Sequence, residues 1–148
     1  MNKQDFEYDH DDFKKDILKT AFAYQRLSNR FGEVVEHWKE LGTDYLSGSI
    51  VVDAESTSSR VTGNACGKPF AINLVPLIAH GENYALATVS TNNLLDGEPV
   101  ELCQFLISIR CGIWSTEGEE LIDADDDHLG FKLLVAISRK LLKHPLQG

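Results

Sequence analysis

Cysteine is scarce in this sequence, and its spacing excludes two common ways of stabilising a small fold. The three cysteines, Cys66, Cys103 and Cys111, are an odd number and form no CxxC pair. A disulfide framework needs an even set, and a structural zinc site needs closely spaced ligand pairs. We therefore expect free thiols, no structural metal and a reducing, cytoplasmic location.

Long apolar runs are also absent. No stretch approaches the roughly 18 apolar residues that a membrane-spanning helix needs, and residues 1–13 lack the apolar core of a secretory signal. Positively charged residues are also few, because the chain has 14 Lys and Arg and 23 Asp and Glu, which gives a net charge of −9. Nucleic acids and anionic membrane surfaces attract clustered Lys and Arg. The composition therefore predicts no direct nucleic-acid binding and no membrane association.

The motifs that identify most enzymes are missing. No phosphate loop (GxxxxGKS/T or GxGxxG), nucleophile elbow (GxSxG) or zinc helix (HExxH) occurs. Asp123, Asp125 and Asp127 have the alternating spacing that opens a calcium loop, but His128 replaces its glycine and Leu134 its bidentate glutamate. We expect no metal and no cofactor, and the sequence favours a role other than catalysis.

The length of 148 residues, with 43% hydrophobic and 25% charged residues, fits one globular domain. We expect a flexible N-terminus over residues 1–8 and a single α+β domain over residues 9–148. Apolar residues recur every three or four positions from about Asp9 to Leu41, which predicts a long helix. Gly42 suits its end, while Gly32 leaves its continuity open. A second amphipathic helix is predicted over about 126–143.

Short apolar segments separated by turns fill the middle of the chain. They lie at residues 49–52, 60–63, 70–78, 84–91, 100–113 and 121–122. Short connections favour antiparallel neighbours, so we predict a five- or six-stranded, mostly antiparallel meander with the C-terminal helix packed on the sheet. Pro76 indicates an edge, a bulge or a strand end. Residues 100–113 are apolar on both faces, which predicts cover on both sides, by helices or by a second subunit.

Acidic residues are concentrated in two windows. Residues 5–16 hold six carboxylates and two lysines, residues 117–127 hold seven carboxylates and no base, and the rest of the chain carries +2. Helix capping uses one or two carboxylates, so the second window exceeds what capping explains. Trp114 beside it suits an interface anchor. The predicted partner-binding residues are Trp114, Glu117, Glu119, Glu120, Asp123, Asp125 and Asp126.

Two functions from different classes remain open. The first is a small acidic domain that engages a basic protein partner, as an inhibitor or immunity protein, a chaperone or a regulator would. The second is a small-molecule sensor or modest enzyme, with a pocket between helix and sheet lined by loop residues such as Cys66, His80, Glu82 and Arg110. Lys68 and His80 could activate Cys66 in such a site. A homodimer is compatible with either function.

Overall fold

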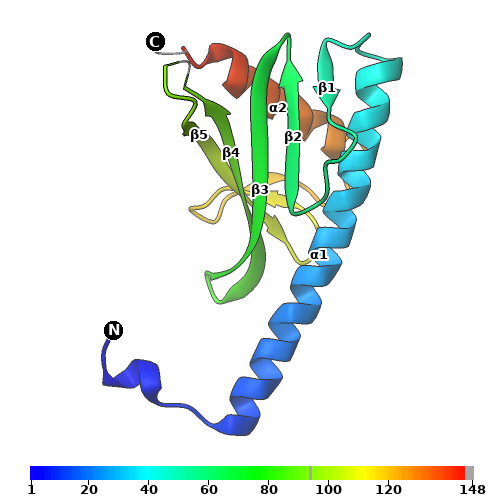
Figure 1. The fold of residues 1–148 in the computed structure, drawn as a ribbon. Helices are drawn as coiled ribbons and strands as arrows, with labels where there is room; N and C mark the ends of the chain where they lie inside the picture. The colour runs from blue at the N-terminus through cyan, green and yellow to red at the C-terminus, as the bar shows by residue number, and fades with distance from the viewer. Residues whose placement is uncertain (94, 146–148) are drawn as a thin grey trace.

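The computed structural model describes residues 1–93 and 95–145, and it places both long helices on one face of a curled antiparallel sheet (Figure 1). The seven strands pair in chain order, from β1 at one edge to β7 at the other. The elements are η1 (Lys3–Phe6), α1 (His10–Asp44), β1 (Ile50–Val52), β2 (Arg60–Ala65), β3 (Lys68–Ala79), β4 (Glu82–Asn92), β5 (Pro99–Ser108), β6 (Ile113–Trp114), β7 (Glu120–Ile122) and α2 (Leu129–Lys143). The predicted α+β meander is confirmed, with seven strands rather than five or six. Residues 94 and 146–148 of the predicted domain lie outside the described part of the chain.

Helix α1 begins as its sequence predicts but ends differently. The Asp9 side chain caps it by accepting hydrogen bonds from the backbone N–H of Asp11 and Asp12, at 2.9 and 3.1 Å. The helix continues through Gly32 and through the predicted stop at Gly42. A Cβ atom on Gly42 would lie 2.4 Å from the carbonyl oxygen of Ile50. Gly42 is therefore needed for the close approach of β1, and the helix ends at Asp44.

The main core lies between the two helices and one face of the sheet. It is a continuous cluster that includes Leu27, Phe31, Val35 and Trp38 of α1, Leu133, Leu134, Ile137 and Leu141 of α2, and Val61, Ile72, Ala87, Val89, Phe105 and Ile107 of the strands. The fully buried Trp38 also donates a 2.7 Å hydrogen bond from Nε1 to the carbonyl oxygen of Gly130, which joins the two helices. Both long helices therefore lie on the same face of the sheet, so they do not supply the cover predicted for both faces of residues 100–113, and cover by a second subunit stays a prediction.

The predicted strand at 100–113 is interrupted. After Ser108 the chain turns, since the Ser108 N–H donates to the Gly112 carbonyl at 3.0 Å and Cys111 adopts a φ of 70°. This tight loop separates β5 from β6 and accounts for the additional strand. Along β5, burial on both faces is limited to Phe105, Leu106 and Ile107. Phe105 and Ile107 join the main core, whereas Leu106 is buried outside it, on the opposite face of the curled sheet.

Pro76 occupies an edge-like position, as its missing N–H predicts. Strand β3 pairs with β2 only as far as Asn73, while it continues to pair with β4 as far as Ala79. Pro76 therefore lies in the part of β3 that has one neighbouring strand.

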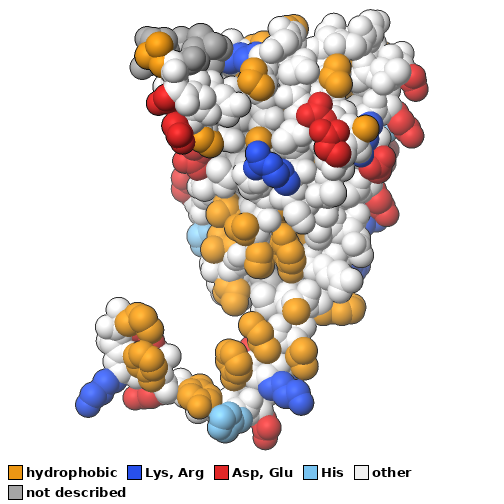
Figure 2. Space-filling model, viewed as in Figure 1, with side chains coloured by type: hydrophobic (Ala, Val, Ile, Leu, Met, Phe, Trp, Pro, Cys, Tyr) orange, Lys and Arg blue, Asp and Glu red, His pale blue; other side chains and the backbone are white. Residues whose placement is uncertain are grey.

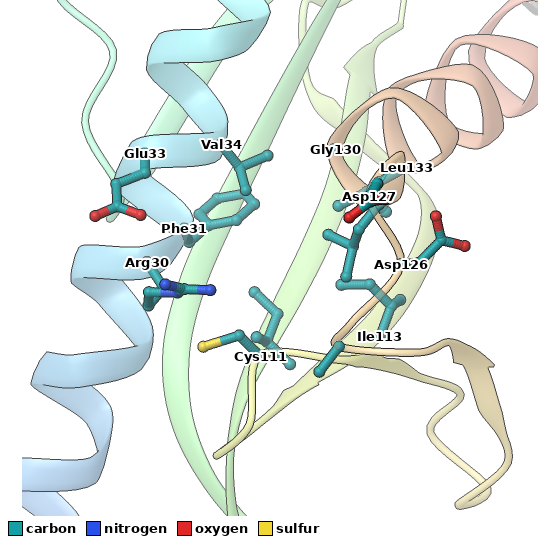
Figure 3. Close-up of a pocket in the computed structure, with 13 residues that line it drawn as sticks. Arg30, Phe31, Glu33, Val34, Cys111, Ile113, Asp126, Asp127, Gly130 and Leu133 are labelled. Carbon is teal, nitrogen blue, oxygen red and sulfur yellow. The ribbon is translucent and has the colours of Figure 1, made fainter.

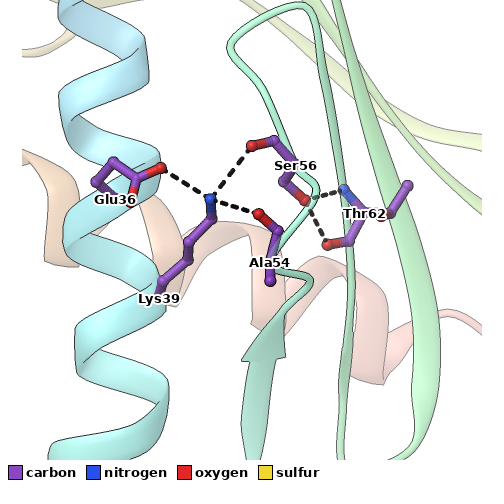
Figure 4. Close-up of polar contacts among 5 residues, drawn as sticks. All are labelled: Glu36, Lys39, Ala54, Ser56 and Thr62. Atoms are coloured by element: carbon purple, nitrogen blue, oxygen red, sulfur yellow. Dashed lines mark hydrogen bonds and ion pairs between the residues drawn. The ribbon is translucent and has the colours of Figure 1, made fainter.

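Lys39 fastens the loop after β1 to helix α1 (Figure 4). Its Nζ atom lies 2.8 Å from Glu36 Oε1 and donates to the carbonyl oxygens of Ala54 and Ser56, at 3.0 and 3.3 Å. The Ser56 hydroxyl in turn bonds both the N–H and the C=O of Thr62 on β2. The loop is thus held to the helix and to β2 by polar contacts at a position with few apolar residues.

The first residues of the chain project beyond the sheet (Figure 1). We call residues 1–22 the N-terminal arm; none of them is buried, and Ala23 is the first buried residue of α1. Within the segment predicted to be flexible, Lys3–Phe6 form one 3-10 turn capped by Asn2. Thr20 Oγ1 donates to Asn83 Oδ1 at 3.0 Å, where the arm meets the turn between β3 and β4.

Candidate functional site

The predicted partner-binding residues come together on the hairpin formed by β6 and β7 and on the turns that lead to α2. Strand β7 is an edge of the sheet and is only three residues long. The hairpin closes through hydrogen bonds from Ser115 N–H to the Glu119 carbonyl, 2.7 Å, and from Gly118 N–H to the Ser115 carbonyl, 3.0 Å. Short, charged edge strands resist pairing with other sheets, so part of this acidity protects the edge.

Two apolar side chains accompany the carboxylates. Trp114 lies across from Leu106 of β5 and across from Glu120 of β7, and it is half-buried rather than a free exposed anchor. The strand register shifts beside it, so that Ile113 pairs with Ile122 while Trp114 pairs with Glu120. Leu121 is the additional residue at this shift, and its side chain is 54% exposed. The exposure of this leucine was not predicted from the sequence.

Most carboxylates of the second acidic window are exposed. Glu117, Glu119, Glu120, Asp123 and Asp125 are all exposed. Among the described residues, Asp126 is the member of the predicted set that forms an ion pair, with Lys132 at 2.5 Å. The hairpin therefore presents negative charge that this part of the chain does not neutralise.

Asp123 and Asp126 have a structural role. Asp123 Oδ1 accepts a hydrogen bond from Asp125 N–H, and Asp126 Oδ1 accepts one from His128 N–H, both at 2.8 Å. Such local bonds compete with helix formation, so α2 begins at Leu129 instead of the predicted 126. The hydrogen bond from Lys132, with that from His128 N–H, lowers the pKa of the Asp126 carboxyl. Asp126 thus stays charged while it shapes the turn.

His80 connects this hairpin to the turn between β3 and β4. Its Nε2 atom lies 3.1 Å from the carbonyl oxygen of Thr116, and its ring would lie 3.4 Å from a Cβ on Gly118. His80 and Gly81 have φ values of 51° and 76°, as a two-residue I′ hairpin turn requires. This contact ties the acidic hairpin to the turn between β3 and β4. Sequence reasoning missed this role, because the turn pattern of His80 does not show which other hairpin it meets.

The structure separates the residues proposed for thiol chemistry. Cys66 lies in the turn between β2 and β3, at the opposite end of the 12-residue strand β3 from His80. At about 3.3 Å per residue the two turns are roughly 40 Å apart, so His80 cannot act as a base for Cys66. Lys68 Nζ donates to the carbonyl oxygen of His144. Burial raises the pKa of the Cys103 thiol, which disfavours its reactive thiolate.

A small pocket lies between α1, the loop before β6 and the start of α2 (Figure 3). Arg30 and Cys111 point toward each other on one side of it, and Asp126 and Asp127 lie on its other side, near the start of α2. Its volume of about 160 Å³ is below the roughly 300–1,000 Å³ of typical ligand pockets. The predicted ligand residues Cys66, His80, Glu82 and Arg110 do not line it. This cavity therefore gives little support to the small-molecule hypothesis.

Within residues 1–93 and 95–145, no group of three or more His, Cys, Asp or Glu is arranged to hold a metal ion. In the same residues, no helix has the length and apolar character needed to cross a membrane.

Comparison of the chain with protein-family models, with curated proteins and with solved structures yields no match in any of the three.

Proposed function

We propose that this chain is a protein-binding domain that engages a basic protein partner through the hairpin of β6 and β7 and the turns that follow it. The observation that carries the proposal is an exposed apolar residue, Leu121, and the half-buried Trp114 among exposed carboxylates. Interfaces commonly combine a few apolar anchors with a charged rim. The carboxylates would attract and orient the partner, and the apolar residues would be buried on docking.

Edge protection and helix capping explain only part of this surface. Edge protection accounts for Glu120, the charged residue of β7, and Asp123 and Asp126 are used in turns. Glu117, Glu119 and Asp125 are exposed and accept no hydrogen bond within the described chain from a side chain. The contact between His80 and Thr116 keeps the hairpin in one position before binding, which reduces the ordering cost of association.

The proposal is tested by capturing proteins from the native host on the immobilised chain at low salt. The site variant combines Glu117→Lys, Glu119→Lys, Glu120→Lys and Asp125→Lys. The control combines Asp44→Lys, Glu55→Lys, Glu98→Lys and Glu101→Lys, which are exposed and lie outside the hairpin. Because each set replaces four carboxylates by four lysines, both change the net charge equally.

We expect the wild type and the control to capture the same basic protein, and the site variant to lose it. Elution by salt should follow, because rim charges are screened at high ionic strength. Equal capture by all three chains would contradict the proposal, as would a captured partner that is acidic.

A further inference from the structure

Strand β5 has a free edge over most of its length. It pairs with β4 from Pro99 to Ser108, but β6 pairs only with Leu106 and Ile107. Among the described residues, residues 99–105 therefore have one neighbouring strand, and the backbone N–H and C=O groups on their other side are open to pairing. In Figure 1 this part of β5 lies at the border of the sheet, close to the end of α2.

Helix α2 is basic in a chain that is otherwise acidic. Residues 128–145 hold four Lys or Arg and no Asp or Glu, whereas residues 1–127 hold 10 Lys or Arg and 23 Asp or Glu. Three of the four bases are exposed and form no ion pair with any described residue: Arg139, Lys140 and Lys143. The helix macrodipole favours cations in the last turn, which accounts in part for Lys140 and Lys143 but not for Arg139.

These bases and the free edge meet in an open groove between α2 and β5, which we call the basic groove. Its volume is about 550 Å³, within the roughly 300–1,000 Å³ of typical binding pockets. Its lining includes three apolar and three basic residues: Leu102, Ala136, Pro145, Arg139, Lys140 and Lys143. Burial raises the pKa of the Cys103 thiol, and the charge of Lys140 opposes that rise. Lys140 therefore lies close to β5.

A β-bulge shapes the edge beside the basic groove. Val89 pairs with Cys103, and the next residue of β4 pairs with Glu101. Leu102 is therefore an additional residue of β5, and it packs against the main core together with Cys103. Glu101 is exposed and does not line the groove. A bulge blunts an edge against long strands, so this edge suits a short segment.

The two faces of this edge differ in charge. The groove on the side of α2 is lined by three bases, whereas Figure 2 views the face of the sheet away from α2 and shows Asp and Glu side chains at its left border, near β5. Successive side chains of an added strand point to opposite faces, so carboxylates at alternate positions would all face α2. Two copies that paired their β5 edges would bring these bases together, and like charges repel. The charges therefore favour an acidic segment of a different protein over a second copy.

We propose that the free edge of β5 and the basic groove bind a short extended segment of an acidic protein, which adds as a strand to β5 and places its carboxylates beside Arg139, Lys140 and Lys143. Main-chain hydrogen bonds to residues 99–105 would supply affinity, and the alternate side chains would supply selectivity. The site shares no residue with the acidic hairpin of β6 and β7 and has the opposite charge, so it would take a different partner.

The test uses the full chain and three fluorescent peptides of about seven residues, close to the length of a typical strand. The first alternates glutamate with valine. The second replaces its glutamates by lysine, and the third replaces its valines by proline and keeps every carboxylate. Because proline lacks an N–H, the third peptide retains the charge but cannot pair as a strand. We expect fluorescence anisotropy to show binding of the first peptide alone, with a dissociation constant below about 1 mM.

The basic residues are tested by substitution with glutamine. The site variant combines Arg139→Gln, Lys140→Gln and Lys143→Gln, and it should bind the first peptide about tenfold more weakly, as expected for the loss of three exposed ion pairs. The control combines Lys14→Gln, Lys15→Gln and Lys19→Gln. These lysines are exposed on the N-terminal arm, their loss changes the net charge equally, and the control should bind as the wild type does.

Hydrogen exchange locates the bound peptide. With the peptide at about ten times its dissociation constant, the amides of residues 100–105 that face the free edge should exchange about tenfold more slowly. No binding below about 1 mM, equal binding of the three peptides, equal binding by the site variant, or protection elsewhere than at residues 100–105 would each overturn the proposal. A chain that is dimeric without peptide, with these amides already protected, would show that a second copy occupies the edge and would overturn it as well.

Discussion

The imidazole Nε2 of His80 lies 3.1 Å from the carbonyl oxygen of Thr116, and this contact joins two hairpins that are distant in the sequence. Residues 115–119 close the acidic hairpin, so His80 supports the surface on which binding is proposed. Asparagine suits the positive φ of such a turn but is too short to keep the contact. His80→Asn should therefore preserve the turn between β3 and β4 and loosen the acidic hairpin.

A lost hydrogen bond of about 1 kcal/mol raises amide exchange roughly fivefold. We expect that increase at Gly118 and Glu119, measured by hydrogen exchange. Cys66→Asn is the matched control, because Cys66 occupies the same position in the other I′ turn, with a φ of 53°. Unchanged exchange in the His80 variant would show that the contact does not hold the hairpin.

Two glycines of α1 should respond oppositely to alanine. A Cβ on Gly32 would meet only Ser58 Cβ at 3.8 Å, an ordinary contact. Gly32→Ala should therefore raise the free energy of unfolding by about 0.5–1 kcal/mol. On Gly42 a Cβ would lie 2.4 Å from the Ile50 carbonyl oxygen, so Gly42→Ala should lower it by about 1–3 kcal/mol. Urea unfolding measures the free energy of unfolding of both variants. A change of the same sign in both would contradict the prediction.

The ion pair of Asp126 should make stability depend on pH in the acidic range. Its carboxyl pKa is lowered in the folded chain by the hydrogen bonds from Lys132 and from His128 N–H. A lowered folded pKa stabilises the fold above the unfolded pKa, and the stabilisation is lost as pH falls through the folded value. The midpoint temperature of thermal unfolding should therefore fall less between neutral and acidic pH in Asp126→Asn than in the wild type. A carboxyl resonance of Asp126 that titrates at or above the usual range would contradict this expectation.

The thiols should differ in reactivity. Cys66 is exposed, whereas Cys103 is partly buried and its pKa is raised by that burial. A thiol-specific reagent near pH 8 should label Cys66 first and Cys103 slowly, as followed by mass spectrometry of the labelled peptides. Faster labelling of Cys103 would show that the outer part of β5 opens readily.

Much of the fold could be predicted from the sequence because its patterns are local. The spacing of apolar residues in α1, the Asp9 cap and the short strands with tight turns each act within a few residues. The end of α1 could not be predicted, because Gly42 is needed for a close approach to Ile50 and not for a helix stop. That approach exists only in the folded chain. The break between β5 and β6 was hidden by apolar residues on both sides of a loop. The start of α2 was missed because Asp126 forms a turn with His128 instead of a cap.

The acidic site was predicted in composition but not in shape. The windows of charge were visible in the sequence, while the exposure of Leu121 depends on a shift of strand register and the position of the hairpin depends on His80. The N-terminal arm shows the opposite case. Its helical stripe was evident from the sequence, but only the structure shows that Phe13 and Ile17 of that stripe are 58% and 50% exposed.

The central claim is that the carboxylates of the β6 and β7 hairpin bind a basic partner, and the salt dependence of that affinity tests it most directly. The dissociation constant of the captured protein would be measured by calorimetry between about 50 and 500 mM NaCl. For the wild type and the control set we expect affinity to fall steeply with salt. For the set at Glu117, Glu119, Glu120 and Asp125 we expect binding weaker by at least about tenfold at low salt, with a shallower slope. Equal affinities and equal slopes for both sets would contradict the account.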